Sequence, residues 1–168
     1  DAGDEPAAAD RDEHGGGLIS GIAVAVKDLL PGTRVIGVEP ELAADARDSL
    51  RAGTRIAWTA AQTARTSADA LRVEEVGELT FPHIRAYVDD IVTVTEEEIR
   101  DAIRRLARES RLIAEPGGAA AVAAALDRTA GELGITASAG AGRPGAPIVA
   151  LLSGGNIDPA LLADILRD

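Results

Sequence analysis

Three consecutive glycines, Gly15, Gly16 and Gly17, stand directly before Leu18 and a stretch with helical periodicity. Glycine lets the backbone come close to a ligand, and the first amides of a helix are unpaired donors in a positive field. The pattern therefore predicts a site for a phosphate group. A plain turn that starts a helix would use the same glycines, so the turn alone does not settle its function.

One interpretation of this turn is a dinucleotide-binding Rossmann unit. A glycine turn, a helix, a strand and then Glu39 follow the order of that fold, in which an acid after the second strand binds ribose. The glycine fingerprint is incomplete, because Gly15 and Gly17 match it but Ser20 stands at its third glycine. The fingerprint should also follow an apolar strand, and here an acidic segment precedes it.

The composition excludes several classes of function. The chain has 168 residues, a net charge of -11, and neither cysteine nor methionine. No basic stripe is available to neutralise nucleic-acid phosphates, and no cysteine can serve as a nucleophile or metal ligand. No apolar run reaches the length of a membrane span, so we expect a soluble, cytoplasmic protein. Because there is no initiator methionine, we also expect the chain to be part of a longer polypeptide.

The chain divides into two regions of different composition. Residues 1–14 hold six acids and no large apolar residue, which predicts a disordered acidic tail. Residues 15–168 alternate short apolar runs with helical patterns, and Thr95 and Glu98 form a capping-box pattern. Residues 53–81 show no clear period and are expected to be a long connection. Strands are expected at 34–38, 90–94 and 148–152, and helices at 18–30, 41–50, 96–110, 116–133 and 159–166. The alternation predicts an α/β fold, with a mostly parallel open sheet and helices on both faces.

Six motifs follow one another along residues 15–159: GGGLISGIAVAVK, VIGVEPELAADA, SADALRV, YVDDIVTVTEEEI, LIAEPGGAAAVAAAL and LLSGGNIDP. Together they resemble the threonine/serine dehydratase (ammonia-lyase) and serine racemase family of fold type II pyridoxal-phosphate enzymes. This ordered set favours that family over the Rossmann interpretation. The resemblance implies that residues 15–168 are the C-terminal part of the cofactor-binding large domain, so that the fold is incomplete.

The resemblance implies pyridoxal phosphate as the cofactor. Gly15, Gly16, Gly17 and the amide of Leu18 match the positions that hold its phosphate. Ser153, in the SGGN motif, matches the hydroxyl that hydrogen-bonds the pyridine nitrogen. A neutral hydroxyl does not hold that nitrogen protonated as a carboxylate would, which suits β-elimination. The alternative for Ser153 is a residue that merely forms a turn at the end of a strand.

The resemblance also implies a cation site. Glu39, Asp45 and the backbone carbonyl of Ala43 match ligands that bind a divalent cation in several family members. Such an oxygen set suits Mg²⁺ or Ca²⁺. The alternative is a pair of solvated surface acids. His14 stands at the place of the first glycine of the family's tetraglycine turn, and we expect it to be an exposed tail residue without a catalytic role.

Two departures from the family pattern bear on function. Family members usually carry glycine after Ala-Asp, where the backbone passes the cofactor ring, but Ala70 follows Ala68 and Asp69 here. The first half of the family's chain, with the lysine that forms the Schiff base, has no counterpart in this sequence. The only lysine, Lys27, lies ten residues after Gly17. At the rise of a helix this is about 15 Å from the phosphate site, too far for Lys27 to substitute, so we expect a solvated helix residue.

The resemblance implies an enzyme that removes water and ammonia from L-threonine or L-serine and yields a 2-oxo acid. A serine racemase-like member and a non-catalytic remnant with weak phosphate or metal affinity are the alternatives. We expect the chain alone to be inactive and marginally stable, since a sheet without the strand before the glycine turn exposes an unpaired apolar edge. We expect a homo-oligomer for the full-length enzyme, and neither nucleic-acid nor membrane partners.

Overall fold

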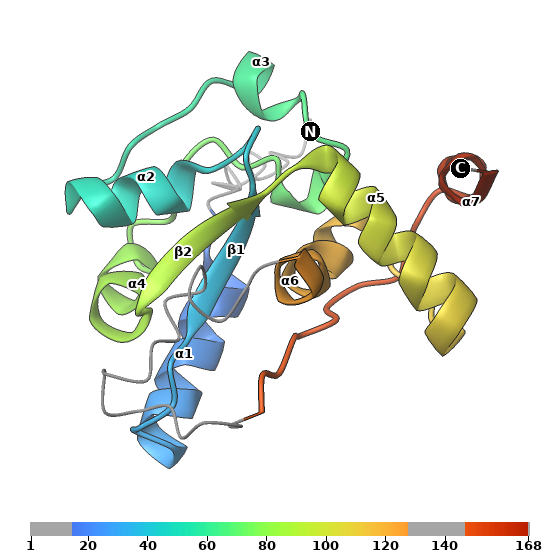
Figure 1. Cartoon of the computed structure of the whole chain (residues 1–168). Coiled ribbons are helices and arrows are strands. Elements are labelled where there is room, and N and C mark those ends of the chain that lie inside the picture. Colours follow the sequence, from blue (N-terminus) through green and yellow to red (C-terminus); the bar gives the residue numbers. More distant parts are fainter. Residues whose placement is uncertain (1–14, 128–146, 168) are drawn as a thin grey trace, which may run out of the picture.

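The computed structural model describes residues 15–127 and 147–167. The predicted acidic tail, His14 and the end of the helix predicted over 116–133 lie outside the described residues. Figure 1 shows the elements in sequence colours. In chain order they are α1 (Gly17–Leu29), β1 (Ile36–Pro40), α2 (Asp45–Ala52), α3 (Ala60–Thr63), a 3-10 turn (Asp69–Leu71), α4 (Phe81–Tyr87), β2 (Asp90–Val94), α5 (Glu96–Arg105), a π-helical turn (Leu106–Ser110), α6 (Pro116–Asp127) and α7 (Pro159–Arg167).

Two parallel strands form the sheet of the described residues. β1 pairs with β2 in a register that places Ile36 opposite Asp90 and Pro40 opposite Val94. Parallel pairing requires a crossover, and α2, α3 and α4 lie in the connection between the two strands. The predicted α/β class with a parallel sheet is confirmed.

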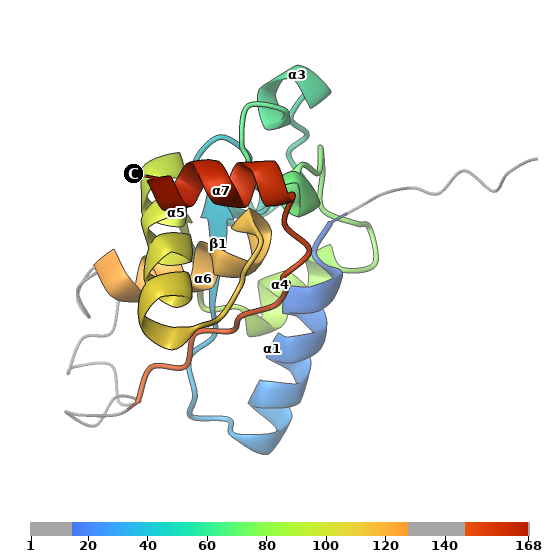
Figure 2. The same ribbon diagram turned by 90° about the vertical axis from the view of Figure 1, so that its right-hand side faces the viewer.

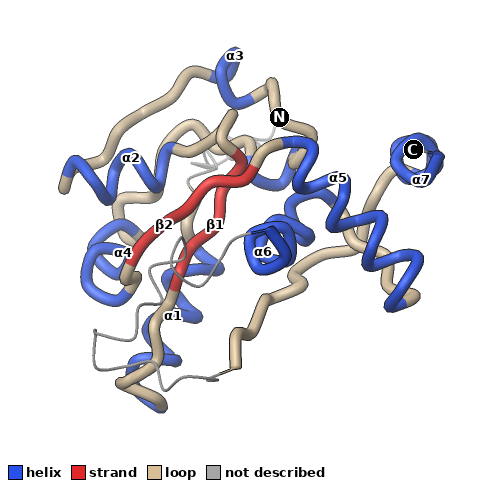
Figure 3. Tube along the Cα trace, in the orientation of Figure 1, coloured by secondary structure: helices blue, strands red, loops and turns tan. Residues whose placement is uncertain are grey.

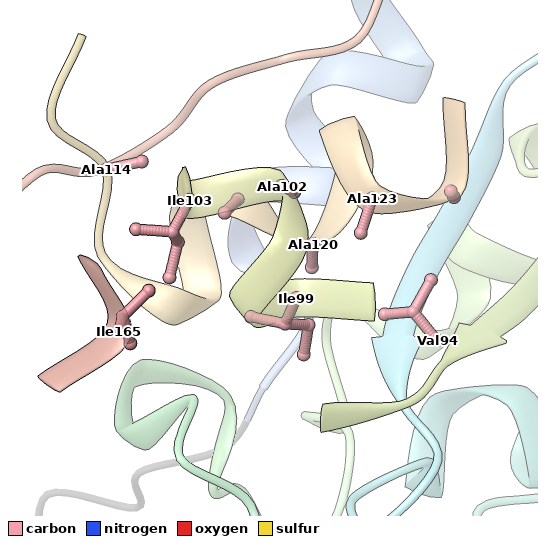
Figure 4. Packing of buried hydrophobic residues seen from close by; sticks show 10 residues of the cluster. Val94, Ile99, Ala102, Ile103, Ala114, Ala120, Ala123 and Ile165 are labelled. Atoms are coloured by element: carbon pink, nitrogen blue, oxygen red, sulfur yellow. The ribbon is translucent and has the colours of Figure 1, made fainter. Parts of the chain in front are cut away.

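Helices cover both faces of this sheet (Figures 1 and 2). On one face α5, α6 and α7 enclose an apolar cluster that includes Val94, Ile99, Ile103 and Ile165 (Figure 4). Because α6 buries mainly alanines, its backbone comes close to the strands. These fully or almost fully buried alanines are Ala119, Ala120, Ala123 and Ala124.

The opposite face is covered by α1, α2 and α4. Ile91, the neighbour of Val92 in β2, points to this side and packs with Ala23 of α1 and with Phe81 and Ile84 of α4. The two clusters therefore bury residues on both faces of β2, which explains why Ile91, Val92 and Val94 are all apolar.

The strand predicted at residues 148–152 is not formed, and this prediction is wrong. The segment runs as a loop towards α7 (Figure 3). Val149 is 87% exposed, and Ile148 and Leu151 are about half exposed. A strand needs a neighbour to accept and donate its backbone hydrogen bonds, and among residues 15–127 and 147–167 none pairs with this segment.

Hydrogen bonds that acidic side chains accept from backbone amides shift two element boundaries. β1 begins at Ile36, two residues later than predicted, because the Val35 amide donates to Asp89 Oδ2 (2.7 Å) and not to β2. The helix predicted over 41–50 begins at Asp45, because the Glu39 carboxylate accepts the amides of the first turn of α2.

The connection predicted over 53–81 contains α3 and the 3-10 turn, and periodicity missed α4 directly after it. The capping box of α5 is confirmed. The Glu98 amide donates to Thr95 Oγ1 (3.2 Å), and the Thr95 amide donates to Glu98 Oε2 (2.6 Å). After α5 the chain continues as the π-helical turn. This helical segment ends at Arg111, whose φ of 59° lies in the left-handed region. No helix in the described ranges is long and apolar enough to cross a membrane.

Candidate functional site

The glycine turn is anchored at its first residue. Gly15 forms a parallel bridge in which its amide donates to the Glu75 carbonyl (3.1 Å) and its carbonyl accepts from the Gly77 amide (3.0 Å). Thr80 Oγ1 donates to the same Gly15 carbonyl over 2.8 Å. These bonds attach the start of α1 to the segment that leads into α4, so the turn has a fixed place on the domain.

Gly16 is the residue where this turn requires glycine. It caps α1 with a φ of 94°, in the left-handed region that L side chains rarely adopt. A Cβ at this position would lie 2.8 Å from Ile84 Cδ1 and 3.0 Å from Thr80 Oγ1. Both the backbone conformation and the packing against α4 therefore exclude a side chain.

The first turn of α1 faces open space. A Cβ built on Gly17 meets no heavy atom within 4 Å, and Leu18 is 60% exposed. Among the residues that the structure describes, none makes a side-chain cap hydrogen bond to this end, and the first turn of α1 holds no acidic residue. The amide dipoles of a 13-residue helix thus end at an accessible, uncapped terminus that favours an anion such as phosphate.

Ser153 is positioned by a different element. The residue is exposed, and the turn over residues 153–156 lies against the start of α6. The Glu115 amide donates to the Gly154 carbonyl (3.1 Å), and the Asn156 amide donates to Glu115 Oε2 (2.9 Å). No hydrogen bond joins Ser153 to the glycine turn within the described ranges. The structure thus gathers Gly15, Gly16, Gly17 and Leu18 in one turn and holds Ser153 separately.

Lys27 lies in the last turn of α1, at the opposite end from the glycines. Its Nζ forms an ion pair with Asp89 Oδ2 (2.7 Å) and donates to the Thr33 carbonyl (2.9 Å). The expectation of a merely solvated lysine needs correction, since the side chain is only 21% exposed and ties α1 to the start of β2. Burial raises the pKa of Asp89, but the bonds from Lys27 and the Val35 amide outweigh it, so this pKa is below its ordinary value.

The predicted cation ligands lie together where β1 meets α2. Asp45 is 3% exposed and Ala43 is 1% exposed, so the alternative of two solvated surface acids is wrong for Asp45. Both oxygens of Glu39 accept amides of α2, from Ala46 (3.1 Å) and Arg47 (2.8 Å). Burial and the neighbouring charge of Asp45 raise the pKa of Glu39 to about 8. Burial also raises the pKa of Asp45 to about 6.

This arrangement does not by itself form a metal centre. Glu39 already acts as the cap of α2, and the described residues contain no group of three or more His, Cys, Asp or Glu side chains that could hold a metal ion. Carboxylate oxygens are the donor type that a hard cation prefers, but the described residues supply no third acidic or histidine side chain to complete the site.

Three positioning residues were missed in the sequence. Thr80 and Glu96 carried no signal, whereas Glu115 stands before Pro116 at a helix start, a place where an acid often binds backbone amides. Glu96 Oε2 accepts the Ser67 amide (2.8 Å) and Oε1 accepts the Thr66 hydroxyl, which fixes the loop that contains Ala70.

Ala70, the departure from the family's glycine, is exposed. Its methyl would lie 3.4 Å from a Cβ built on Gly117, which is ordinary contact distance.

Comparisons with known proteins match these features. Residues 14–154 match the family model described as pyridoxal-phosphate dependent enzyme. The L-threonine ammonia-lyase of Thermotoga maritima is 38% identical over 91% of this chain and 34% of its own length. The serine racemase of Arabidopsis thaliana is 39% identical over 91% of this chain and 43% of its own length.

The fold matches as well. The crystal structure of a threonine deaminase from T.th. superposes with a TM-score of 0.70 at 42% identity, over 86% of this chain and 48% of the other. The chain thus spans between a third and a half of the length of these relatives. It belongs to the pyridoxal-phosphate dependent enzymes, in the fold type II group that contains threonine ammonia-lyases and serine racemases.

Proposed function

We propose that this chain supplies the C-terminal, phosphate-binding part of a pyridoxal-phosphate dependent threonine/serine dehydratase (ammonia-lyase). The observation that carries this proposal is the glycine turn. It is held by Thr80 and the bridge to Val76, it needs glycine at Gly16, and it opens α1 towards free space. The same stretch lies inside residues 14–154, which match the family of pyridoxal-phosphate dependent enzymes.

The residues of the turn fit the cofactor's phosphate. The amides of Gly17 and Leu18 lie at an uncapped helix start, where a dianion is stabilised by the dipole and by direct donors. The Ser153 hydroxyl, exposed on its turn, would pair with the pyridine nitrogen without holding it charged. When bound, the cofactor supplies the electron sink for loss of the α-proton and the β-hydroxyl.

The chain lacks a residue that could bond the cofactor covalently. Lys27 is its only lysine, and the ion pair to Asp89 holds it at the far end of α1, about 15 Å from the glycine turn at the rise of a helix. We therefore propose that activity requires the lysine-bearing half of the fold from another source, and that the isolated chain is inactive. In the full enzyme the substrate would be L-threonine or L-serine.

Two alternatives differ from this proposal. A serine racemase-like enzyme would use the same turn and Ser153, and it is supported by the 39% identity to a plant serine racemase. A non-catalytic remnant would keep weak phosphate or metal affinity only. The homo-oligomer and the cytoplasmic location expected from the sequence stay predictions.

Complementation tests the proposal. The purified chain is mixed with a separately made N-terminal half of the Thermotoga maritima L-threonine ammonia-lyase and pyridoxal phosphate, and release of 2-oxo acid from L-threonine is measured. We expect activity from the mixture and none from either half. Ser153→Ala should reduce it, and the control Lys27→Arg, which keeps the ion pair, should not. No activity from a mixture that forms a complex would favour the remnant, and racemisation without 2-oxo acid would favour the racemase.

The divalent cation also stays part of this proposal. Its support is the proximity of two desolvated carboxylates, Glu39 and Asp45, at the end of β1. Calorimetric titration with Mg²⁺ and Ca²⁺ tests it. Binding that Asp45→Asn abolishes would support the site, and an absence of heat at millimolar cation would contradict it.

A further inference from the structure

The turn over residues 153–156 is held by one acidic residue through two different groups. The Glu115 amide donates to the Gly154 carbonyl (3.1 Å), and the Glu115 carboxylate accepts the Asn156 amide (2.9 Å). The main chain and the side chain of Glu115 thus bind the turn on both sides of Gly155. A single substitution at Glu115 removes only the side-chain half of this attachment.

Close packing shows how tightly the turn is seated. A Cβ built on Gly154 would overlap the Glu115 carboxylate. A Cβ built on Gly118, in the first turn of α6, would overlap the Gly154 carbonyl oxygen and lie 2.7 Å from its amide nitrogen. The carboxylate therefore lies against the backbone of the residue that directly follows Ser153.

Glu115 itself has a fixed backbone. Ala114 before it is fully buried in the cluster with Ile103, and Pro116 after it is buried at the start of α6. Proline fixes its own φ and restricts the residue before it to an extended conformation. The carboxylate is thus attached to a backbone that is held in place. The turn that it binds follows the exposed segment over residues 148–152, which pairs with no strand of the described residues.

We propose that Glu115 is a positioning residue for Ser153, and that it holds the turn so that the serine hydroxyl meets the pyridine nitrogen of the cofactor. This inference rests on the proposed function and deepens it at the ring end of the site. The carboxylate acts as a hydrogen-bond acceptor for a backbone amide, so its oxygen is required and its charge is not. Gly118 contributes by leaving space for the Gly154 carbonyl.

Hydrogen exchange of the full chain, followed by NMR, measures directly how well the amides of this turn are protected. In Glu115→Ala the Asn156 amide should exchange about tenfold faster, as expected for the loss of one hydrogen bond, while amides of α5 stay unchanged. Glu115→Gln keeps an acceptor oxygen and should retain the wild-type rate. The control is Glu109→Ala, since Glu109 is an exposed acid on the π-helical turn. Unchanged Asn156 exchange in Glu115→Ala would overturn the inference.

Binding of pyridoxine 5'-phosphate, which has no aldehyde and cannot react with lysine, reads the functional consequence. Glu115→Ala and Ser153→Ala should each weaken this probe about fivefold to tenfold, and the double variant should be no weaker than either single one. Affinity for inorganic phosphate should stay unchanged, and Glu115→Gln should restore probe binding. A merely structural role would weaken both probes together.

The outcomes separate the inference from the function on which it rests. If Ser153→Ala weakens the ring probe and Glu115→Ala does not, the inference is wrong and the proposed function stands. If wild-type and Ser153→Ala proteins bind the probe equally, or neither binds it, the proposed role of Ser153 is wrong and the inference falls with it.

Discussion

At the scale of single residues, Gly16 must be glycine for two structural reasons. The sequence pattern predicted only that the backbone at this glycine comes close to a ligand. Its φ of 94° and the short approach to Ile84 show that it serves the domain's own packing as well. Gly17 next to it has no such constraint, because its Cβ would point into open space. The turn therefore contains one glycine required by the fold and one that leaves room for a ligand.

Gly16→Ala should destabilise the chain by about 1–3 kcal/mol, because it forces an alanine into the left-handed region and into Ile84. Urea unfolding followed by circular dichroism measures this change. The matched control is Gly21→Ala in the same helix, where a Cβ meets no atom within 4 Å and should stabilise by up to about 1 kcal/mol. Equal stability of the two variants would contradict this account of Gly16.

The ion pair of Lys27 and Asp89 makes a pH-dependent contribution. The folded-state pKa of Asp89 lies below its ordinary value of 3.8, so the pair stabilises the fold at higher pH and loses this effect as pH falls through the folded pKa. At pH 7 Asp89→Asn should lower the free energy of unfolding by less than about 1 kcal/mol, because the pair is partly exposed.

The difference between wild-type and Asp89→Asn proteins should shrink below about pH 4. Thermal melts from pH 7 to pH 3.5 measure it, with Asp28→Asn, next to Lys27 on α1, as the control for loss of a surface charge. A difference that grows towards acid pH would show that Lys27 does not depress the pKa of Asp89.

At the scale of elements, the sequence predicted those boundaries of helices and strands that depend on neighbouring residues. β2 was predicted at its observed bounds, Asp90–Val94, and the capping box placed the start of α5. The starts of β1 and α2 were wrong by two to four residues, because Asp89 and Glu39 bind the amides there. Neither the contact across 54 residues from Val35 to Asp89 nor the contact of Glu39 with amides seven and eight residues later leaves a periodic signal in the sequence.

The site was predictable to a similar extent. The glycine turn could be predicted because glycine types and a following helix are visible in the sequence. Its anchors, Thr80 and the bridge to Val76, lie about 60 residues away in the chain and could not be predicted. The strand over 148–152 failed because an apolar run specifies a buried environment, and the partner strand that would complete it is not among the described residues.

Thr95→Ala should cost about 1 kcal/mol, because it removes the side-chain half of a capping box on a helix that packs its Ile99 and Ile103 in the core. Thr59→Ala removes the same motif from α3, a four-residue helix whose first residues are exposed, and should cost less. Chemical denaturation of both variants makes the comparison. A larger loss for Thr59→Ala would show that the cap's contribution does not depend on the packing behind it.

At the scale of the whole molecule, the chain exposes apolar residues that a sheet would normally bury. Ile148, Val149 and Leu151 lie on the segment that leads to Ser153 and α7, and each is about half or more exposed. The relatives are two to three times as long as this chain. An exposed apolar segment of this kind is expected to associate with other chains.

The chain should therefore form concentration-dependent oligomers, which light scattering coupled to size-exclusion chromatography would detect. The variant Val149→Ser should shift the equilibrium towards monomer. Leu79→Ser is the matched control, because Leu79 is 84% exposed but stands alone on a different loop. A strictly monomeric wild-type chain, or an equal effect of both variants, would contradict this account of the segment.

The central claim is that this chain holds the cofactor without a lysine of its own to bond it. The most direct measurement is borohydride reduction of the chain incubated with pyridoxal phosphate, followed by mass-spectrometric peptide mapping, with Lys27→Arg as the control. We expect that no saturable pyridoxyl group forms on Lys27, because Asp89 and the Thr33 carbonyl bind its Nζ far from the glycine turn. Stoichiometric, saturable labelling of Lys27 with an accompanying visible absorbance band would contradict it and would make the chain a self-sufficient cofactor site.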